Sequence, residues 1–184
     1  MSAEKGLNSN IFHLWVMYLC QMNAYTYAYP RPALTTDCVV LTTHSTSPKV
    51  LLIKRKHPPF KGFWAFPGGF VNMDEDLESA AARELEEETA IRGIQLKQFK
   101  TYGHPLRDPR HRTVTVVFAA FVENEIHPIP ADDAAEANWF ALDSLPPLAF
   151  DHQAILSELL LSVRMQIKEV CLPVTMTHTM NCFL

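Results

Sequence analysis

The sequence lacks the features that would assign it to a membrane or to a nucleic-acid polymer. The apolar stretch at residues 11–19 (IFHLWVMYL) is shorter than the roughly 20 apolar residues that a membrane-spanning helix needs. Positive charge is not in excess either, because 16 Lys and Arg residues stand against 20 Asp and Glu residues. Non-specific nucleic-acid binding depends on a broad positive field. We therefore expect neither a membrane nor a nucleic acid as the main partner.

Closely spaced cysteine pairs are also missing among the four cysteines, which are Cys20, Cys38, Cys171 and Cys182. No two of them have the spacing of a zinc knuckle or a redox motif. We interpret them as reduced thiols in a cytoplasmic protein. A signal peptide at residues 11–19 is the alternative, but Tyr18 and Leu19 stand where a cleavage site has small residues.

The length and composition favour one domain. With 184 residues, 48% of them hydrophobic, the chain can bury a single substantial core. We place this domain at residues 29–170. Residues 1–28 are predicted to be an N-terminal extension, and residues 171–184 form a tail without clear periodicity.

Runs of β-branched and aliphatic residues predict a sheet. Residues 38–43 (CVVLTT) and 50–55 (VLLIKR) predict a hairpin. Further strands are expected at 94–102 and 113–122, and a short last strand at 138–142. The run at 113–122 has the near-continuous apolar character of a strand buried on both faces.

Two amphipathic helices are expected, which makes the fold class α/β with helices on both sides of a mixed sheet. The first helix begins near Asp74 and ends at Thr89, with one apolar stripe along it. The second is capped by Asp151. The apolar positions that fall on one face of it are Ile155, Leu159, Val163 and Ile167.

Three glutamates of the first helix form the chemically informative pattern. Glu84, Glu87 and Glu88 lie at i, i+3 and i+4, so their carboxylates crowd one patch. Each like-charged pair costs roughly 0.2–0.5 kcal/mol on a helix surface, and a bound divalent cation would reverse that sign. Magnesium prefers such hard oxygen ligands. By itself, the pattern also fits a solvated acidic helix face.

The residues around the glutamates complete an ordered pattern that resembles the Nudix box. The matching residues are Gly69, Glu75, Arg83, Glu84, Leu85, Glu87, Glu88 and Ile91. Ala90 departs, because the family has glycine there. Glycine after a helix usually adopts a left-handed conformation, which alanine takes up at a cost of roughly 1 kcal/mol. We therefore expect a modest effect on stability or an altered turn, with metal binding retained.

The resemblance implies an α/β/α sandwich with a mixed central sheet and a loop-helix-loop that holds Mg²⁺ or Mn²⁺. It makes Glu84, Glu87 and Glu88 metal ligands, together with the backbone carbonyl of Gly68. Arg83 would orient the glutamates, with Gly69 and Glu75 as structural support of the box. Glu84 and Glu88 are the first choice for the proton acceptor.

Two further groups of residues have possible functional roles. The segment 131–138 (ADDAAEAN) is either a solvated acidic loop or the source of an alternative base, which would be Asp132, Asp133 or Glu136. The loop 107–112 carries three arginines that could hold phosphates or a ribose, or could simply be solvated: Arg107, Arg110 and Arg112. Aromatic side chains that could stack on a base, or belong to the core, are Trp64, Phe60, Phe63 and Tyr102.

The wider pattern resembles the ADP-ribose pyrophosphatase branch of the family. It comprises YPRPALTTD at 29–37, RDPR at 107–110, DDAAEANWF at 132–140 and LPPLAFDHQAIL at 145–156. That resemblance implies hydrolysis of ADP-ribose, a small-molecule substrate, to AMP and ribose 5-phosphate. Many relatives form dimers, so a homodimer is possible.

Two other functions stay open. One is a pyrophosphohydrolase for non-canonical nucleoside triphosphates, which would use the same metal site. The other is a non-catalytic, ligand-sensing transcriptional regulator. Such regulators carry a winged-helix domain after the Nudix domain, whereas about 34 residues follow Phe150 here, and the acidic box positions of this sequence are intact.

Overall fold

The computed structural model describes residues 27–43, 47–130 and 134–171. The contacts divide the chain into two units, residues 1–31 and residues 32–184, and the helices and strands of the described residues lie in the second unit. Most of the predicted N-terminal extension, and the tail after residue 171, lie outside the described residues. Among the helices that are described, none is both long and apolar enough to cross a membrane.

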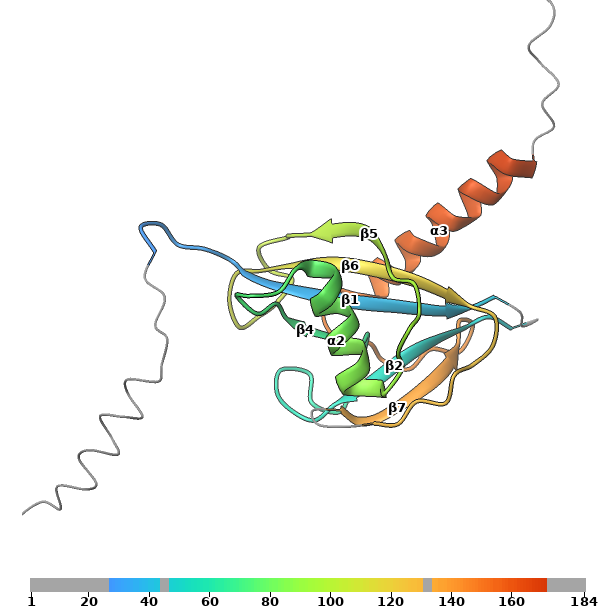
Figure 1. Cartoon of the computed structure of the whole chain (residues 1–184), viewed down its shortest axis with the longest axis horizontal. Helices are drawn as coiled ribbons and strands as arrows, with labels where there is room; N and C mark the ends of the chain where they lie inside the picture. Colours follow the sequence, from blue (N-terminus) through green and yellow to red (C-terminus); the bar gives the residue numbers. More distant parts are fainter. Residues whose placement is uncertain (1–26, 44–46, 131–133, 172–184) are drawn as a thin grey trace, which may run out of the picture. The chain divides into compact units, whose positions relative to one another are not determined.

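Seven strands form one mixed sheet (Figure 1). The strands are β1 (Ala33–Thr42), β2 (Lys49–Arg55), β3 (Trp64–Ala65), β4 (Gly68–Phe70), β5 (Lys97–Tyr102), β6 (Thr113–Val122) and β7 (Ala134–Ala141). The main order is β3-β2-β1-β6-β5, with β4 paired to β1 and β7 paired to β2. Only the ten-residue pairing of β1 with β6 is parallel among these described ladders. The β1–β2 pairing is antiparallel, as predicted.

Helices cover both faces of the sheet, because alternate side chains of the central strands point to opposite faces. Cys38 and Val40 of β1 pack in the cluster that contains Ala81 and Leu85 of α2 (Leu77–Thr89). Val39 and Leu41 pack instead in the cluster that contains α3 (His152–Cys171). The predicted α/β/α sandwich with a mixed sheet is confirmed.

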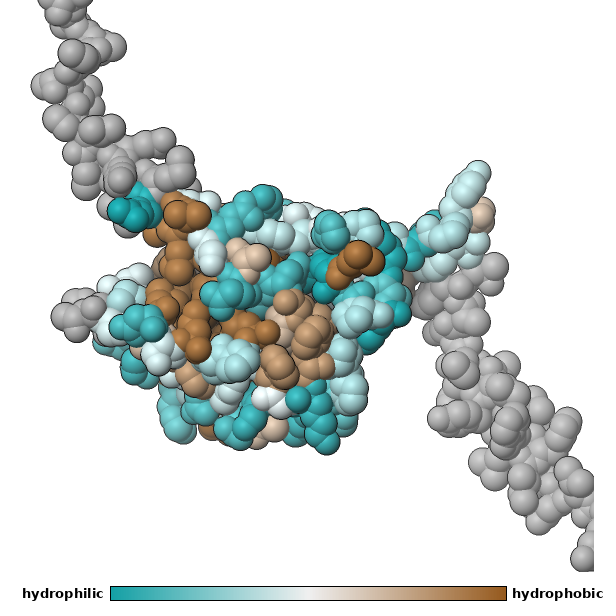
Figure 2. Space-filling view, turned by 180° about the vertical axis from the view of Figure 1, so that it is seen from behind, coloured by the Kyte–Doolittle hydropathy of each residue, from teal (hydrophilic) through white to brown (hydrophobic). Residues whose placement is uncertain are grey.

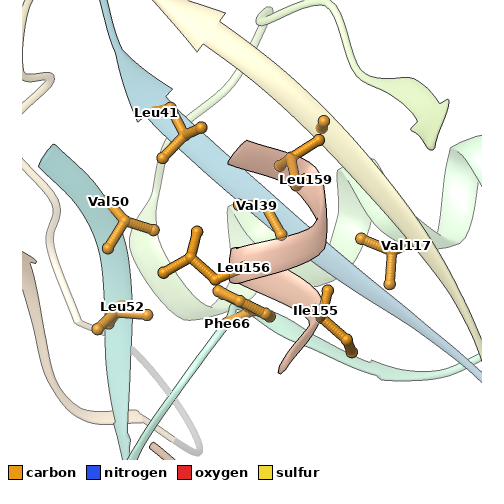
Figure 3. Packing of buried hydrophobic residues seen from close by; sticks show 10 residues of the cluster. Val39, Leu41, Val50, Leu52, Phe66, Val117, Ile155, Leu156 and Leu159 are labelled. Carbon is orange, nitrogen blue, oxygen red and sulfur yellow. The ribbon is translucent and has the colours of Figure 1, made fainter. Parts of the chain in front are cut away.

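The cluster on the α3 face is the largest of the three core clusters of the described residues (Figure 3). Ile155, Leu156 and Leu159 of α3 contact the strand residues and Phe66, and each of these side chains is at most 2% exposed. Burying such a side chain stabilises the fold by about 1.5–3 kcal/mol. Viewed from behind the sheet, apolar residues also gather at the surface (Figure 2), and Leu161 of α3 is 60% exposed.

Several predicted boundaries were wrong. The strand expected at 94–102 begins at Lys97, and the helix expected from Asp74 begins at Leu77 with Asp76 as its N-cap. The Asp76 carboxylate accepts a hydrogen bond from the Ser79 N–H at 2.7 Å, so the acidic residues before it belong to the preceding loop. The last strand is β7, which is longer than the predicted 138–142, because its backbone pairs with β2 along most of that strand's length.

Ala90 ends helix α2 in the conformation that glycine favours. Its backbone φ is 59° and ψ is 10°, and its N–H donates to the Glu86 carbonyl oxygen at 2.7 Å. The left-handed turn is therefore kept without the glycine. The cost falls on stability, because an L-residue crowds its own carbonyl in this conformation.

We predict that Ala90→Gly stabilises the protein. Relief of the left-handed strain gains roughly 1–2 kcal/mol, and the greater freedom of glycine in the unfolded chain offsets part of it, leaving about 0.5–1 kcal/mol. Urea unfolding measures the difference. The matched control is Gly93→Ala, which has a φ of 70° and open space around its Cα and should lose about 1 kcal/mol. An Ala90→Gly variant no more stable than the native chain would contradict this account.

Candidate functional site

One pocket of about 400 Å³ brings together the start of β1, the end of β2, the loop around β4, helix α2 and the start of α3. Its lining contains acidic, basic and aromatic side chains. The acidic residues are Asp37, Glu84, Glu88 and Asp108. The basic and aromatic ones are Arg55, Lys56, His57, Phe66, Phe70, Arg83, Arg107, Arg110, Phe150 and His152.

Arg83 is the centre of a hydrogen-bond network on α2. Its guanidinium donates to both carboxylate oxygens of Glu75 at 2.9 and 2.5 Å, to Glu84 at 2.7 Å and to Glu87 at 3.0 Å. It also donates to the carbonyl oxygen of Phe70 at 3.1 Å. The hydrogen bonds from Arg83 lower the pKa of Glu75 to about 2. Arg83 therefore connects Glu75, Glu84, Glu87 and the backbone at Phe70.

Glu84 and Glu88 direct charge into the pocket without full compensation. Burial raises the pKa of Glu88 to about 8, with a further contribution from the charges of Glu84 and Asp37. Burial also raises the pKa of Glu84, against the opposing effect of Arg83. Glu88 accepts one hydrogen bond, at 2.8 Å, from the N–H of Gly68. Both carboxylates would be stabilised as anions by a cation beside them.

Two glycines make room for this arrangement. A Cβ on Gly68 would meet the Thr36 carbonyl oxygen at 2.2 Å, so only glycine allows β4 to approach β1 here. A Cβ on Gly69 would lie 2.5 Å from the carboxylate atoms of Glu84. The backbone at Gly69 thus leaves the space that the Glu84 carboxylate occupies.

The residues present fit a divalent cation. Carboxylates of Glu84 and Glu88 and the nearby Gly68 carbonyl are hard oxygen donors of the kind that magnesium prefers. Glu87 does not line the pocket, and its side chain is 47% exposed. In the described ranges no three His, Cys, Asp or Glu side chains converge into a ready-made cage, so waters and substrate oxygens would have to complete the coordination.

The three arginines of the loop 107–112 have different environments. Arg107 has a side chain only 4% exposed, and it donates two hydrogen bonds to Asp151 at 3.0 and 2.8 Å. Arg110 is 35% exposed and is held by Asp108, whose own side chain is buried. Arg112 does not line the pocket. Arg110 is therefore the arginine of this loop that is open to a ligand.

A second arginine, Arg55, lies near Arg110 in the pocket, and the sequence did not single it out. Arg55 donates to the neutral carbonyl oxygen of Pro59 at 3.0 Å. Burial, and then the charge of Arg110, lower its pKa. The guanidinium carbons of Arg55 and Arg110 lie 4.8 and 5.7 Å from the centroid of the Phe150 ring. The pocket thus holds a like-charged pair of arginines as well as a like-charged pair of glutamates.

Several residues proposed from the sequence lie elsewhere. Trp64 packs edge-on against Phe140 with a ring-centroid distance of 4.5 Å and does not line the pocket. Glu136 lies on β7, where it pairs with Lys54 at 2.9 Å, and it too is outside the pocket lining. The described part of 131–138 is therefore strand and not acidic loop, because buried alanines at 134 and 137 face the core.

The remaining candidates have mixed positions. Asp132 and Asp133 lie outside the described residues. Phe60 packs against Phe63 and Phe150, and Tyr102 donates a hydrogen bond to Glu158 at 2.9 Å. The side chains of Phe60, Phe63 and Tyr102 do not line the pocket.

Asp37, Phe150 and His152 line the pocket although no motif singled them out for chemistry. Asp37 is the one charged residue of β1 and is itself buried, and a charge next to an apolar run was the signal that could have found it. Phe150 and His152 flank the predicted cap Asp151, in a segment that was noted only for its resemblance.

The structure is an α/β/α sandwich in which carboxylates and guanidiniums line one pocket. A family model described as "NUDIX domain" matches residues 31–160. The chain therefore belongs to the NUDIX domain family.

Individual relatives agree with this assignment. The chain is 40% identical over 131 residues to an "ADP-ribose pyrophosphatase" from Methanocaldococcus jannaschii, which covers 71% of this chain and 74% of that protein. It is 31% identical over 152 residues to the "ADPR responsive transcriptional repressor NtrR" from Acinetobacter baylyi, covering 80% of this chain and 61% of the repressor.

A solved structure adds a ligand to the comparison. The NUDIX domain of Shewanella oneidensis NrtR complexed with ADP ribose superposes with a TM-score of 0.68 and 34% identity, covering 83% of this chain and 97% of that chain. The family and the archaeal homologue together support a Nudix pyrophosphohydrolase, an enzyme class that generally needs divalent metal ions.

We predict that Gly69→Ala weakens metal binding while leaving the fold intact. The new methyl group meets only the flexible end of Glu84, so the carboxylate moves aside and the stability cost stays below about 1 kcal/mol. Because the displaced carboxylate of Glu84 is a proposed metal ligand, the affinity for Mn²⁺ should weaken roughly 10- to 100-fold. Calorimetric titration measures this. The control is Gly103→Ala, whose nearest contact would be an ordinary 3.5 Å; equal Mn²⁺ affinity in both variants would refute the assignment of Glu84.

Proposed function

We propose that this protein hydrolyses ADP-ribose to AMP and ribose 5-phosphate with Mg²⁺, or alternatively Mn²⁺, as cofactor. The observation that carries the proposal is the pair of like-charged clusters in one pocket, Glu84 with Glu88 and Arg55 with Arg110. A dication stabilises the first cluster, and a diphosphate stabilises the second. A metal-bound diphosphate is the ligand that satisfies both.

Glu84, Glu88, Glu87 and the Gly68 carbonyl are the proposed metal ligands, with Glu87 reaching the site only after it turns from Arg83. When bound, the cation would neutralise charge on the diphosphate and lower the pKa of a coordinated water. Arg83 keeps Glu84 in place by its hydrogen bond at 2.7 Å. Glu75 in turn holds Arg83 on its opposite side through two hydrogen bonds.

The carboxylate of Glu84 or Glu88 takes the proton in the proposed reaction. The oxygen of a water molecule bonds to phosphorus, the bond from that phosphorus to the bridging oxygen breaks, and the proton of the water passes to the carboxylate. Burial raises the pKa of Glu88 to about 8, so without a cation this carboxyl is mostly protonated at neutral pH. A cation bound beside it would favour the carboxylate form, which is the form that can accept the proton.

The aromatic and basic wall of the pocket is the proposed contact for the rest of the substrate. Phe70 and Phe150 line the pocket, and the Arg110 guanidinium lies 5.5 and 5.7 Å from their ring centroids. Aromatic faces suit stacking with a base, and a fixed guanidinium suits a phosphate or ribose. The names of the archaeal relative and of the ADP-ribose complex support ADP-ribose as the compound.

A regulatory function has one specific observation in its favour, the similarity to a repressor that is named for its response to ADPR. Such a protein would bind ADP-ribose and leave it intact. The carboxylates at 84, 87 and 88 and their Arg83 support argue for catalysis, because ligand sensing alone does not need this costly crowding.

A substrate panel with Mg²⁺ distinguishes these functions. We expect rapid release of AMP from ADP-ribose, with 8-oxo-dGTP and other non-canonical triphosphates left intact. Chromatography of the products after timed incubation gives the answer. Preferential hydrolysis of triphosphates would replace the proposed substrate, and tight binding of ADP-ribose without turnover would establish the regulatory alternative.

We predict that Glu88→Gln loses activity and keeps its fold. The amide oxygen can still accept the Gly68 N–H, and the neutral side chain removes a buried charge, so stability without metal should be unchanged or higher. Activity should fall on the order of 100-fold or more. The matched control is Glu86→Gln on the same helix, because among the described residues Glu86 forms an ion pair only with the exposed Arg92 that follows the helix. Undiminished turnover by Glu88→Gln would remove Glu88 from the mechanism.

A further inference from the structure

Phe150 has an unusual backbone conformation at the edge of the pocket. Its φ is 52°, in the left-handed region that a residue with a large side chain rarely adopts. The ring nevertheless occupies a defined place, 4.8 Å from the Phe60 centroid and next to the guanidiniums of Arg55 and Arg110. Such strain persists only where the surroundings hold it.

The residues on both sides of Phe150 are anchored. On the N-terminal side, the buried Ala149 donates its N–H to the Trp64 carbonyl oxygen at 2.7 Å. On the C-terminal side, the Asp151 carboxylate accepts two hydrogen bonds from Arg107, at 3.0 and 2.8 Å. Phe150 therefore lies between two fixed points, and the second of them depends on a partly buried ion pair.

His152 adds a third anchor. Its Nδ1 accepts a hydrogen bond from the Phe66 N–H at 3.0 Å, and its ring stacks on Phe66 with an interplanar angle of 8°. Burial lowers the pKa of His152, so the ring is neutral and carries its proton on Nε2, which faces Asp37 at 3.6 Å. This distance is too long for a strong hydrogen bond. The contacts with Phe66 therefore fix the ring.

Arg107 holds Asp151 in place and is too buried to contact a ligand directly. Its side chain is 4% exposed, and its guanidinium also lies 3.7 Å from the Asp37 carboxylate. Truncating one partner of such a buried pair leaves the other charge uncompensated. In contrast, Arg110, three residues further along, is partly exposed. The same loop thus supplies one buried anchor and one open guanidinium.

We propose that Arg107 and His152 are positioning residues that hold Phe150 in its left-handed conformation, so that its ring forms the wall of the pocket that binds the nucleoside part of the substrate. This proposal rests on the proposed function for the identity of that substrate. The anchored wall acts on affinity and not on the chemical step, because Phe150 is no part of the carboxylate network around Arg83.

The test is steady-state kinetics of Arg107→Lys with ADP-ribose and Mg²⁺. Lysine keeps the charge and loses the two-pronged hydrogen bond to Asp151. We expect KM to rise between about 10- and 100-fold, as for a contact misplaced by about 1 Å, with kcat changed less than about threefold. The control is Leu159→Ala in the core of α3, which should lose stability with KM unchanged. If the KM of Arg107→Lys were no higher than the KM of Leu159→Ala, the proposal would be overturned.

A second variant shows whether the effect passes through Phe150. In Phe150→Ala, the ring is already absent, so adding Arg107→Lys should raise KM less than about threefold further. Full additivity of the two changes would mean that Arg107 acts by another route, and the proposal would fail.

A crystal structure of ligand-free Arg107→Lys separates this proposal from the proposed function. We expect Phe150 to leave its left-handed conformation and its ring to move away from Arg55. That result would support the positioning role whether or not the native protein hydrolyses ADP-ribose. A lack of hydrolysis would disprove only the proposed substrate. An unchanged Phe150 would overturn the positioning role whatever the substrate is.

Discussion

The burial of two neighbouring carboxylates in one pocket is the constraint on which the rest of the site depends. Glu84 and Glu88 both have raised pKa values, mainly because burial removes them from water. The single guanidinium of Arg83 is shared among Glu75, Glu84 and Glu87 and cannot compensate Glu88. Perturbed pKa values of this kind gather at functional sites, where the cost is recovered when a ligand binds.

The sandwich fixes where these carboxylates lie. Small residues on the inner face of α2, Ala80 and Ala81, are fully buried and let the helix approach β1 closely. The Cys38 thiol donates to the Ala81 carbonyl oxygen at 3.3 Å, and this contact joins the strand to the helix. The loop at Gly68 pairs with Asp37 of the same strand. The strand, the loop and the helix therefore meet at the pocket.

How much the sequence could predict depended on the range of each interaction. The apolar periodicity of α2 and the aliphatic runs of β1 are local, so the helix and the mixed sheet were predicted correctly apart from their boundaries. Of the three glutamates, Glu84 and Glu88 line one pocket and Glu87 does not. The burial of Arg107 was not predictable, because Asp151 lies 44 residues away in the sequence. Residues 134–137 were assigned to a loop for a similar reason, since pairing with β2 and not propensity makes them a strand.

The pocket combines an acidic cluster and a basic cluster, and the two together restrict the choice of ligand more than either cluster does alone. An acidic cluster alone would bind many cations, and a basic cluster would bind many anions. Arg55 has a lowered pKa partly because of Arg110, just as the charge of Glu84 raises the pKa of Glu88. Neither cluster can relieve the other fully, because Arg110 is already committed to Asp108 and Arg83 to its glutamates. A ligand that carries its own cation and its own phosphates would stabilise both clusters at once, which is why we propose the metal complex of a diphosphate as the ligand of this pocket.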